Sequence, residues 1–446
     1  MSDTSPDRQE TSPSSVNPTF GEALLFWLKL GWISFGGPAG QIAIMHQELV
    51  ERKKWISNER FLHALNYCML LPGPEAQQLA TYIGWILHRG RGGLVAGVLF
   101  VLPSAFILFC LSYVYVVFGN IPAIVAILAG LKAAVLAIVL SAVIKIGKKS
   151  LKNTLLVNVA VFSFLATYFL RLPFPVLIIG IGIFGIVASF AFPHMLPSAR
   201  MDADSGPAIP LETRHRVASL CKNIALVGVF IILWIVPFLA VLLLLPGTIF
   251  SEEALFFTKA AFLTFGGAYA LLAYIAQAGV QKYAWLTTMQ MMDGLGLAET
   301  TPGPLIMVVQ FVGFLAGWNH PGHLTPLAAA MVGSAVATYF TFLPSFFFIF
   351  AGAPYIERLS SNARMAAALS TITPAVVGVI FNLGLWFGEY VLFPKSGFAW
   401  WSAILALGAF VAMQKFKVGI IPVIAGCGLL GLLLYFVVDF GVVVAS

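Results

Sequence analysis

Long apolar runs separated by short polar breaks make up most of the chain. A helix needs about 20 apolar residues to cross a hydrocarbon core of about 30 Å. The runs that approach this length are Leu94–Phe118, Ile121–Val143, Leu155–Leu170, Val176–Phe192, Ile224–Leu245, Leu324–Phe350, Ala366–Phe387, Ala399–Met413 and Gly419–Val438. The shorter runs need flanking residues to reach both surfaces. The pattern predicts an all-α polytopic membrane protein.

An internal repeat divides the chain into two homologous halves. The segment FWLKLGWISFGGPAG resembles FFTKAAFLTFGGAYA, which begins 256 − 26 = 230 residues later. The same offset of 230 relates Pro72 of LPGPEAQQ to Pro302 of TPGPLIMV, and Trp55 to Trp285. LPSAFILF and LPSFFFIF follow at an offset of 343 − 102 = 241. Four landmarks in one order indicate a duplication, and the two Trp residues fit interfacial anchors.

Short polar segments in each half differ from the long runs. In the first half, 20–35 and 60–71 contain polar residues and end in Gly/Pro clusters. A helix of about 16 residues is only about 24 Å long. We therefore expect discontinuous, re-entrant helical hairpins that turn back within the membrane at the FGG and PGP turns.

Basic residues, which favour the cytoplasmic side, indicate that the two halves have inverted topology. Those that can share one side in the first half and the linker are Arg52, Lys53, Lys54, Arg60, Arg89, Arg91, Lys145, Lys148, Lys149, Lys152, Arg200, Arg214 and Arg216. In the second half, the segment WNHPGH that corresponds to 89–93 has no Lys or Arg. Basic residues there fall one connection later, at Arg358 and Arg364.

This organisation predicts five parts along the chain. They are a polar cytoplasmic tail (1–19), an N-terminal transporter repeat (20–192), a cytoplasmic linker (193–218), a connecting transmembrane helix (219–246) and an inverted C-terminal repeat (247–446). The N-terminus is then cytoplasmic, and the C-terminus lies on the opposite side of the cytoplasmic (inner) membrane. Inverted repeats are a common construction of secondary transporters.

Composition supports a membrane protein and excludes several other classes. Apolar residues make up 60% of the chain and charged residues 10%, whereas soluble chains have about 25% charged residues. The net charge of +7 reports orientation, and no nucleic-acid partner is expected. The four cysteines (Cys68, Cys110, Cys221 and Cys427) have no metal-type spacing. No cofactor, metal site or nucleotide-binding GxxxxGK loop is expected, and no motif of a catalytic site indicates an enzyme.

The same motifs resemble the chromate ion transporter family in its long, two-domain form. The resemblance runs from about Glu22 to the end of the chain and rests on SFGGPAGQIAIMHQELVERKKWIS, LPGPEAQQLATYIGW, FLTFGGAYALL, TTPGP and the paired LPS motifs. It implies a membrane protein that exports chromate and gives chromate resistance, with sulfate as a competitor. It also implies two halves of opposed topology.

Chromate is a tetrahedral dianion, so its site needs hydrogen-bond donors and positive potential. The free N–H groups and the dipole at a helix N-terminus supply both, and glycine lets an anion approach the backbone closely. The expected substrate-binding residues are Lys29, Ser34, Phe35, Gly36, Gly37, Pro38, Gln41, Pro72, Gly73, Pro74, Glu75, Gln78, Lys259, Gly266, Gly267, Thr301, Gly303 and Pro304. The alternative is that Gly and Pro only permit tight helix packing.

Four ionisable residues are functional candidates, and three of them have a second reading. Lys29 and its repeat mate Lys259 either attract the dianion or extend to the membrane surface. Glu75 and Glu299 are proton-coupling candidates, and Glu75 is alternatively a capping acid at a helix N-terminus. Polar residues after PGP, among them Gln77, are replaced by apolar ones in the second half, which gives the first half more weight.

The predicted function is secondary active export of chromate. A sulfate or other divalent oxyanion transporter, working in either direction, and a passive anion channel remain alternatives, because chromate and sulfate share charge and shape. Lipid is the expected surrounding, and a homodimer is left open.

Overall fold

The computed structural model describes residues 18–191, 220–265, 267–352, 363–395 and 397–437. The predicted linker (193–218) and nearly all of the predicted tail (1–19) lie outside these ranges. Every regular element in the described part is a helix, and seven helices are long and apolar enough to cross a membrane. The predicted all-α polytopic fold is confirmed.

The first half contains seven α-helices and one π-helical turn. They are α1 (Phe20–Ile33), α2 (Gly37–His46), η1 (Gln47–Arg52), α3 (Asn58–Cys68), α4 (Glu75–Phe118), α5 (Pro122–Ser150), α6 (Thr154–Tyr168) and α7 (Phe174–Ala191). Helix α4 is interrupted where His88 and Arg89 leave the helical conformation. A Cβ atom on Gly84 would lie 2.5 Å from the carbonyl oxygen of Gly92. The chain therefore folds back at this break, and the two parts of α4 pack together.

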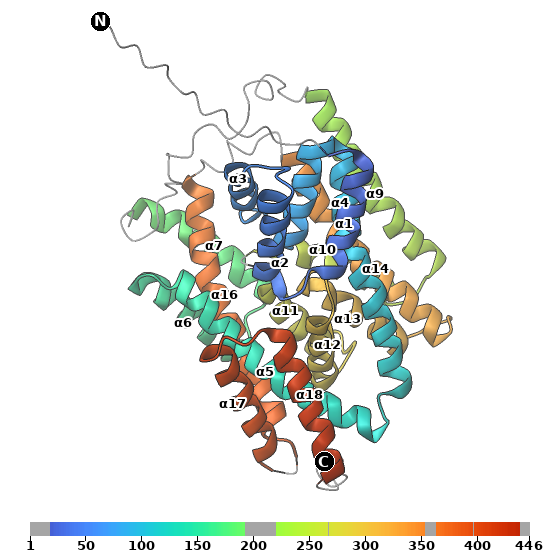
Figure 1. The fold of residues 1–446 in the computed structure, drawn as a ribbon, viewed down its shortest axis with the longest axis vertical. Coiled ribbons are helices and arrows are strands. Elements are labelled where there is room, and N and C mark those ends of the chain that lie inside the picture. The colour runs from blue at the N-terminus through green and yellow to red at the C-terminus, as the bar shows by residue number, and fades with distance from the viewer. Residues whose placement is uncertain (1–17, 192–219, 266, 353–362, 396, 438–446) are drawn as a thin grey trace, which may run out of the picture.

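Helix α9 (Leu220–Leu244) precedes the second half, which repeats this order. The second half contains α10 (Phe250–Phe262), α11 (Ala268–Gln277), η2 (Ala278–Lys282), α12 (Thr288–Thr300), η3 (Leu305–Met307), α13 (Val308–Asn319), α14 (Pro326–Gly352), α16 (Ala363–Leu392), α17 (Trp400–Gln414) and α18 (Ile420–Val437). Helices α13 and α14 correspond to the two parts of α4. In Figure 1, α3 lies above α12 and α13, and the end of α18 is at the bottom.

Backbone details are repeated as faithfully as the motifs. Lys54 and Ala284, which are 230 residues apart, both have a positive φ (54° and 51°), and each follows a π-helical turn, η1 or η2. The next residues are Trp55 and Trp285, with exposed fractions of only 8% and 1%. The expectation that these Trp residues are interfacial anchors is wrong, because both rings pack in the core.

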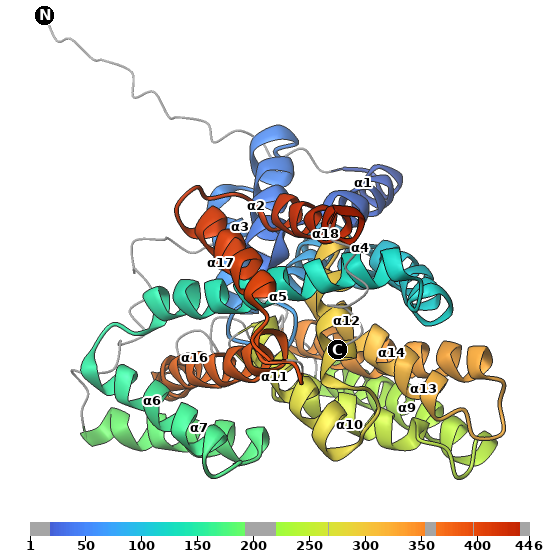
Figure 2. The same ribbon diagram turned by 90° about the horizontal axis from the view of Figure 1, so that it is seen from below.

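The two halves exchange helices. Helices α17 and α18 of the second half pack on α5 of the first, and α6 and α7 of the first half pack on α16 of the second (Figure 2). The contact is close, because a Cβ atom on Gly130 of α5 would lie 2.1 Å from the carbonyl oxygen of Cys427 in α18. Thr371 of α16 donates a hydrogen bond to the carbonyl of Ile181 in α7. Each half therefore has apolar helix surfaces that are covered only by helices of the other half.

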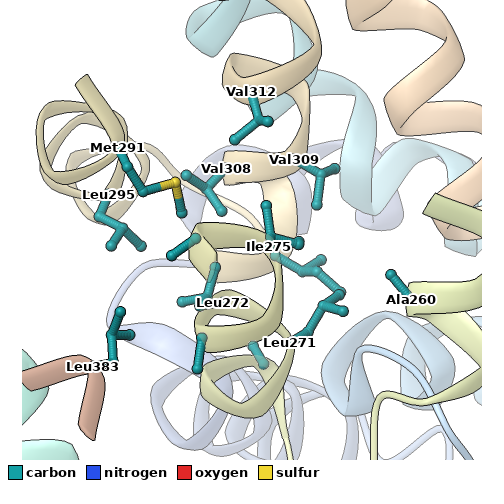
Figure 3. Packing of buried hydrophobic residues seen from close by; sticks show 14 of the residues in the cluster. Ala260, Leu271, Leu272, Ile275, Met291, Leu295, Val308, Val309, Val312 and Leu383 are labelled. Carbon is teal, nitrogen blue, oxygen red and sulfur yellow. The ribbon is translucent and has the colours of Figure 1, made fainter. Parts of the chain in front are cut away.

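The deepest packing surrounds α11. Figure 3 shows Leu271, Leu272 and Ile275 of this helix among side chains of α10, α12, α13 and α16. All three are essentially inaccessible. Helix α11 starts at the second FGG turn, so this packing fixes the position of that turn.

Candidate functional site

The FGG and PGP turns require glycine for their backbone conformation. Gly36 (φ 89°) precedes α2, Gly73 (φ 129°) precedes α4, Gly267 (φ 98°) precedes α11, and Gly303 (φ 98°) precedes η3. Side chains with a Cβ atom rarely adopt this region. Each turn therefore ends one segment and starts a helix in a new direction.

Reciprocal hydrogen bonds join the turns of opposite halves. The amide of Gly73 donates to the carbonyl oxygen of Thr264 at 3.0 Å, and the amide of Gly303 donates to the carbonyl oxygen of Ser34 at 2.7 Å. Thr264 and Ser34 are the residues just before the FGG motifs, and each residue of one bond lies 230 positions from its equivalent in the other bond (73 and 303, 34 and 264). Each PGP turn is therefore bound to the FGG turn of the other half.

The LPS motifs meet the same turns. A Cβ atom on Gly73 would lie 2.6 Å from the Oγ atom of Ser345, and one on Gly303 would lie 2.7 Å from the Cβ atom of Ser104. Ser104 and Ser345 belong to LPS motifs of opposite halves. The sequence repeat showed these motifs but gave them no role. Their serines face the PGP turn of the other half.

Four helix starts surround one small cavity. Its lining comes from the first turns of α2, α4, α11 and η3, namely Pro38, Gln41, Pro74, Glu75, Ala76, Ala268, Pro304, Leu305 and Ile306. The space open to the centre of a water-sized sphere is about 10 Å³, which is roughly what one water molecule needs. None of the four helix N-termini is capped by a side chain. Their positive ends therefore face a common space.

Unpaired polar atoms are concentrated around this junction. The buried oxygens without a hydrogen-bond partner among the described residues include Ser34 Oγ, Gln41 Oε1, Gln77 Oε1, Gln78 Oε1, Ser104 Oγ and Ser345 Oγ. Most other buried helical hydroxyls, with Ser334 as an exception, pair with the carbonyl one turn back, as Ser112 does with Leu108. Because an unpaired buried polar group is costly, the serines of the LPS motifs point to a partner that arrives from outside the protein.

Two glutamines stabilise the turns. The side-chain amide of Gln41 donates to the carbonyl oxygens of Ser34 and Gly303, and so links turns of opposite halves. The amide of Gln78 donates to the carbonyl of Pro72 at 2.7 Å and closes the first PGP turn. Neither residue has a polar counterpart in the second half, where Leu271 and Val308 stand at the equivalent positions.

The structure separates the predicted site residues into two groups. The turn residues Ser34, Phe35, Gly36, Gly37, Pro38, Pro72, Gly73, Pro74, Gly267, Thr301, Gly303 and Pro304, with Gln41, Glu75 and Gln78, belong to the four turns or the helices that start from them. Lys29 and Lys259 are exposed on α1 and α10, and the structure does not bring them to the cavity. Gly266 lies outside the described residues.

The two carboxylates have different surroundings. Glu75 is partly buried and lines the cavity, and a Cβ atom on Gly267 would lie 3.8 Å from its Oε1 atom. It makes no capping hydrogen bond at the start of α4. Glu299 is buried and accepts a hydrogen bond from the hydroxyl of Tyr269 at 2.9 Å.

Known proteins are similar to this chain over both of its halves. The sequence model of the family described as "Chromate transporter" matches residues 21–186 and 252–432, one segment in each half. The chain belongs to the chromate transporter family. Two matched segments in one chain agree with the two repeated halves of the fold.

Several curated relatives match nearly end to end. A "Chromate transport protein" of Cupriavidus metallidurans is 29% identical over 445 residues, which cover 96% of this chain and 97% of the relative. One of Pseudomonas aeruginosa is 29% identical and covers 96% of this chain and 95% of its own length. An uncharacterized transporter of Methanocaldococcus jannaschii is 25% identical and covers 84% and 86%. No solved structure matches.

Proposed function

We propose that this chain is a secondary active transporter that exports chromate across the cytoplasmic membrane and gives chromate resistance. The oxyanion binds where the two FGG turns meet the two PGP turns. The observation that carries the proposal is the convergence of four uncapped helix N-termini on one cavity. The names of the relatives from Cupriavidus and Pseudomonas support chromate as the substrate.

The cavity suits a tetrahedral dianion in its chemistry. Amides in the first turns of α2, α4, α11 and η3 donate hydrogen bonds, and the four helix dipoles supply positive potential without a buried cation. Ser104 and Ser345 lie beside Gly303 and Gly73, outside the lining of the closed cavity, and their hydroxyls add donors when the turns move apart. The cavity in this structure is water-sized, so the four turns have to move apart to admit an anion.

Glu75 links the bound anion to a proton. Its side chain lines the cavity, and a carboxylate next to a dianion is repelled strongly at low dielectric constant. The carboxyl group is therefore protonated when the oxyanion is bound. Glu299, hydrogen-bonded to Tyr269, is the second proton-coupling candidate of the proposal.

The orientation belongs to the same proposal. The basic loops of the first half face the cytoplasm, the N-terminus is cytoplasmic, and the C-terminus lies on the opposite side. The half-helices α1–α3 and α10–α12 enter from opposite surfaces and turn back at the midplane, where inverted-repeat transporters bind their substrates.

Chromate uptake into everted membrane vesicles tests the proposal. We expect energy-dependent accumulation that excess sulfate reduces and an uncoupler abolishes. Accumulation that resists the uncoupler and follows only the electrochemical gradient would identify a channel. Sulfate accumulation without chromate accumulation would identify a sulfate transporter, and no accumulation of either anion by inserted protein would refute oxyanion transport.

A further inference from the structure

A buried ion pair joins the two halves away from the cavity. The ammonium group of Lys132 in α5 lies 3.4 Å from the Oδ1 atom of Asp293 in α12, with side-chain exposures of 16% and 4%. The hydroxyl of Tyr115 in α4 donates to the other carboxylate oxygen at 3.0 Å. The other two ion pairs between described side chains, His46–Glu51 and Arg52–Glu48, lie within one short segment.

The halves differ in how tightly their re-entrant helices are covered. Leu62 of α3 is 45% exposed, whereas its repeat mate Met292 in α12 is inaccessible. Asn66 of α3 is exposed and its mate Gly296 is buried. Helix α12 packs on α5, α16 and α18 in addition to its own hairpin, and α3 packs mainly on α4. Helix α12 is therefore covered more fully than α3, and we call the second half the closed side and the first half the open side.

Asp293 and Lys132 hold the closed side together. They join α12 to α5, and the Cβ position of Gly296, one turn further along α12, lies 3.3 Å from Leu131. The repeat positions of the pair are His63 (293 − 230) and Thr373 (132 + 241), so the open side has no carboxylate–ammonium pair there. In transporters built from inverted repeats, one repeat moves against the other around the binding site. A motion that uncovers α12 separates it from α5 and requires the ion pair to break.

We propose that Asp293 is a proton-binding site whose protonation releases α12 from Lys132 and allows the second half to open. A proton from water binds a carboxylate oxygen of Asp293, Lys132 keeps its ammonium protons, and the pair changes from neutral to a net charge of +1. The role of Asp293 in transport rests on the proposed function, whereas the release of α12 by protonation does not. Breaking a buried ion pair is otherwise strongly unfavourable.

The groups around Asp293 leave few alternative proton acceptors. Lys132 faces it from α5 and Tyr115 from α4. Glu299 lies six residues along α12, which is about 9 Å, and is paired with Tyr269. Helix α13 and helix α18 have no charged residue, and Glu389 of α16 is exposed.

Two measurements on the reconstituted full-length protein test this inference. In the first, spin labels replace Met289 of α12 and Ile121 at the start of α5, which are 37% and 46% exposed, in a chain whose native cysteines are substituted. Electron paramagnetic resonance then measures the distance between the labels without chromate. We expect a second, longer distance between the labels, and the fraction of molecules that show it should increase as the pH falls. In Asp293→Asn this longer distance should be present at every pH. If the distances between the labels change neither with pH nor with the substitution, the proposal is overturned.

In the second measurement, proteoliposomes report chromate exchange and chromate accumulation driven by a proton gradient. Asp293→Asn should keep exchange and lose accumulation, whereas Glu253→Gln, which alters another buried carboxyl group, should keep both. Wild-type accumulation in Asp293→Asn, or loss of exchange by a correctly folded variant, overturns the proposal. If the distance depends on pH but the protein transports no chromate, the proton-binding site at Asp293 is supported and chromate as the substrate is refuted.

Discussion

The amide of Gly73 donates a hydrogen bond to the carbonyl of Thr264, 3.0 Å away in the other half of the chain. Its repeat mate, the amide of Gly303, is bound in the same way to Ser34. Neither amide is free for an anion in this conformation. The amides available for binding are therefore those that follow, in the first turns of the helices. The two PGP glycines position these helix starts, and in this conformation their own amides do not donate to an anion.

Alanine at either PGP glycine should abolish transport. A Cβ atom at Gly73 or Gly303 meets the serine of the opposite LPS motif at under 3.0 Å, and the positive φ adds strain of about 1–3 kcal/mol. Chromate uptake into everted vesicles should fall to background in Gly73→Ala and Gly303→Ala. Gly180→Ala on α7 is the control, because nothing lies within 4 Å of its Cβ position. Normal uptake by both PGP variants would contradict the assigned geometry.

Removal of the LPS hydroxyls should weaken binding without weakening the fold. Ser104 and Ser345 make no hydrogen bond among the described residues, so alanine costs little stability. A hydrogen bond to a charged group contributes about 1.5–3 kcal/mol, which predicts a rise in KM of roughly ten- to a hundredfold. Ser112→Ala, a buried serine of α4 that is bonded to its own helix, should leave KM unchanged. If alanine at Ser104, Ser345 and Ser112 gave equal KM values, Ser104 and Ser345 would not contact the bound anion.

Glutamine in place of Glu75 should flatten the pH dependence of chromate affinity. In the wild type, the affinity should fall as the pH rises, because the ionised carboxylate repels the dianion. Glu75→Gln imitates the protonated group and should bind chromate at high pH as well as at low pH. The apparent affinity for chromate is measured across the pH range in both proteins. A wild-type pH profile in the variant would show that Glu75 does not carry this proton.

The halves should be unstable when expressed alone. Helices α6 and α7 pack on α16, and α17 and α18 pack on α5, so each half exposes the surfaces that its partner covers. A chain divided within 193–218 should give functional protein only when both fragments are expressed together. Fragment levels and chromate uptake measure this. A single half that accumulates and transports chromate would contradict the interlocked arrangement.

The sequence predicted the architecture and the four turns, because long apolar runs and duplicated Gly/Pro motifs have few other physical explanations. It did not predict which turns touch, since the partner of Gly73 lies in the other half. It also did not single out Ser104 and Ser345, although the LPS repeat was the signal that marked them. Lys29 became a site candidate because a charged residue within a membrane segment is costly. The sequence of a short segment does not show which way the side chain points, and in the structure Lys29 is exposed.

The buried ion pair shows a second limit of sequence reasoning. Lys132 is the only charged residue in the apolar run 121–143, and this signal alone makes it a functional candidate. Its partner Asp293 lies in the other half, in a segment whose periodicity does not mark it as buried. Only the packing of α12 on α5 brings the two together.

The location of bound chromate is the most direct test of the proposed site. Chromium scatters X-rays anomalously, so a crystal of the protein with chromate would show its position directly. We predict one anomalous peak between the first turns of α2, α4, α11 and η3, within hydrogen-bonding reach of their amides. A peak beside Lys29 or Lys259, with none at the junction of the four turns, would contradict the account.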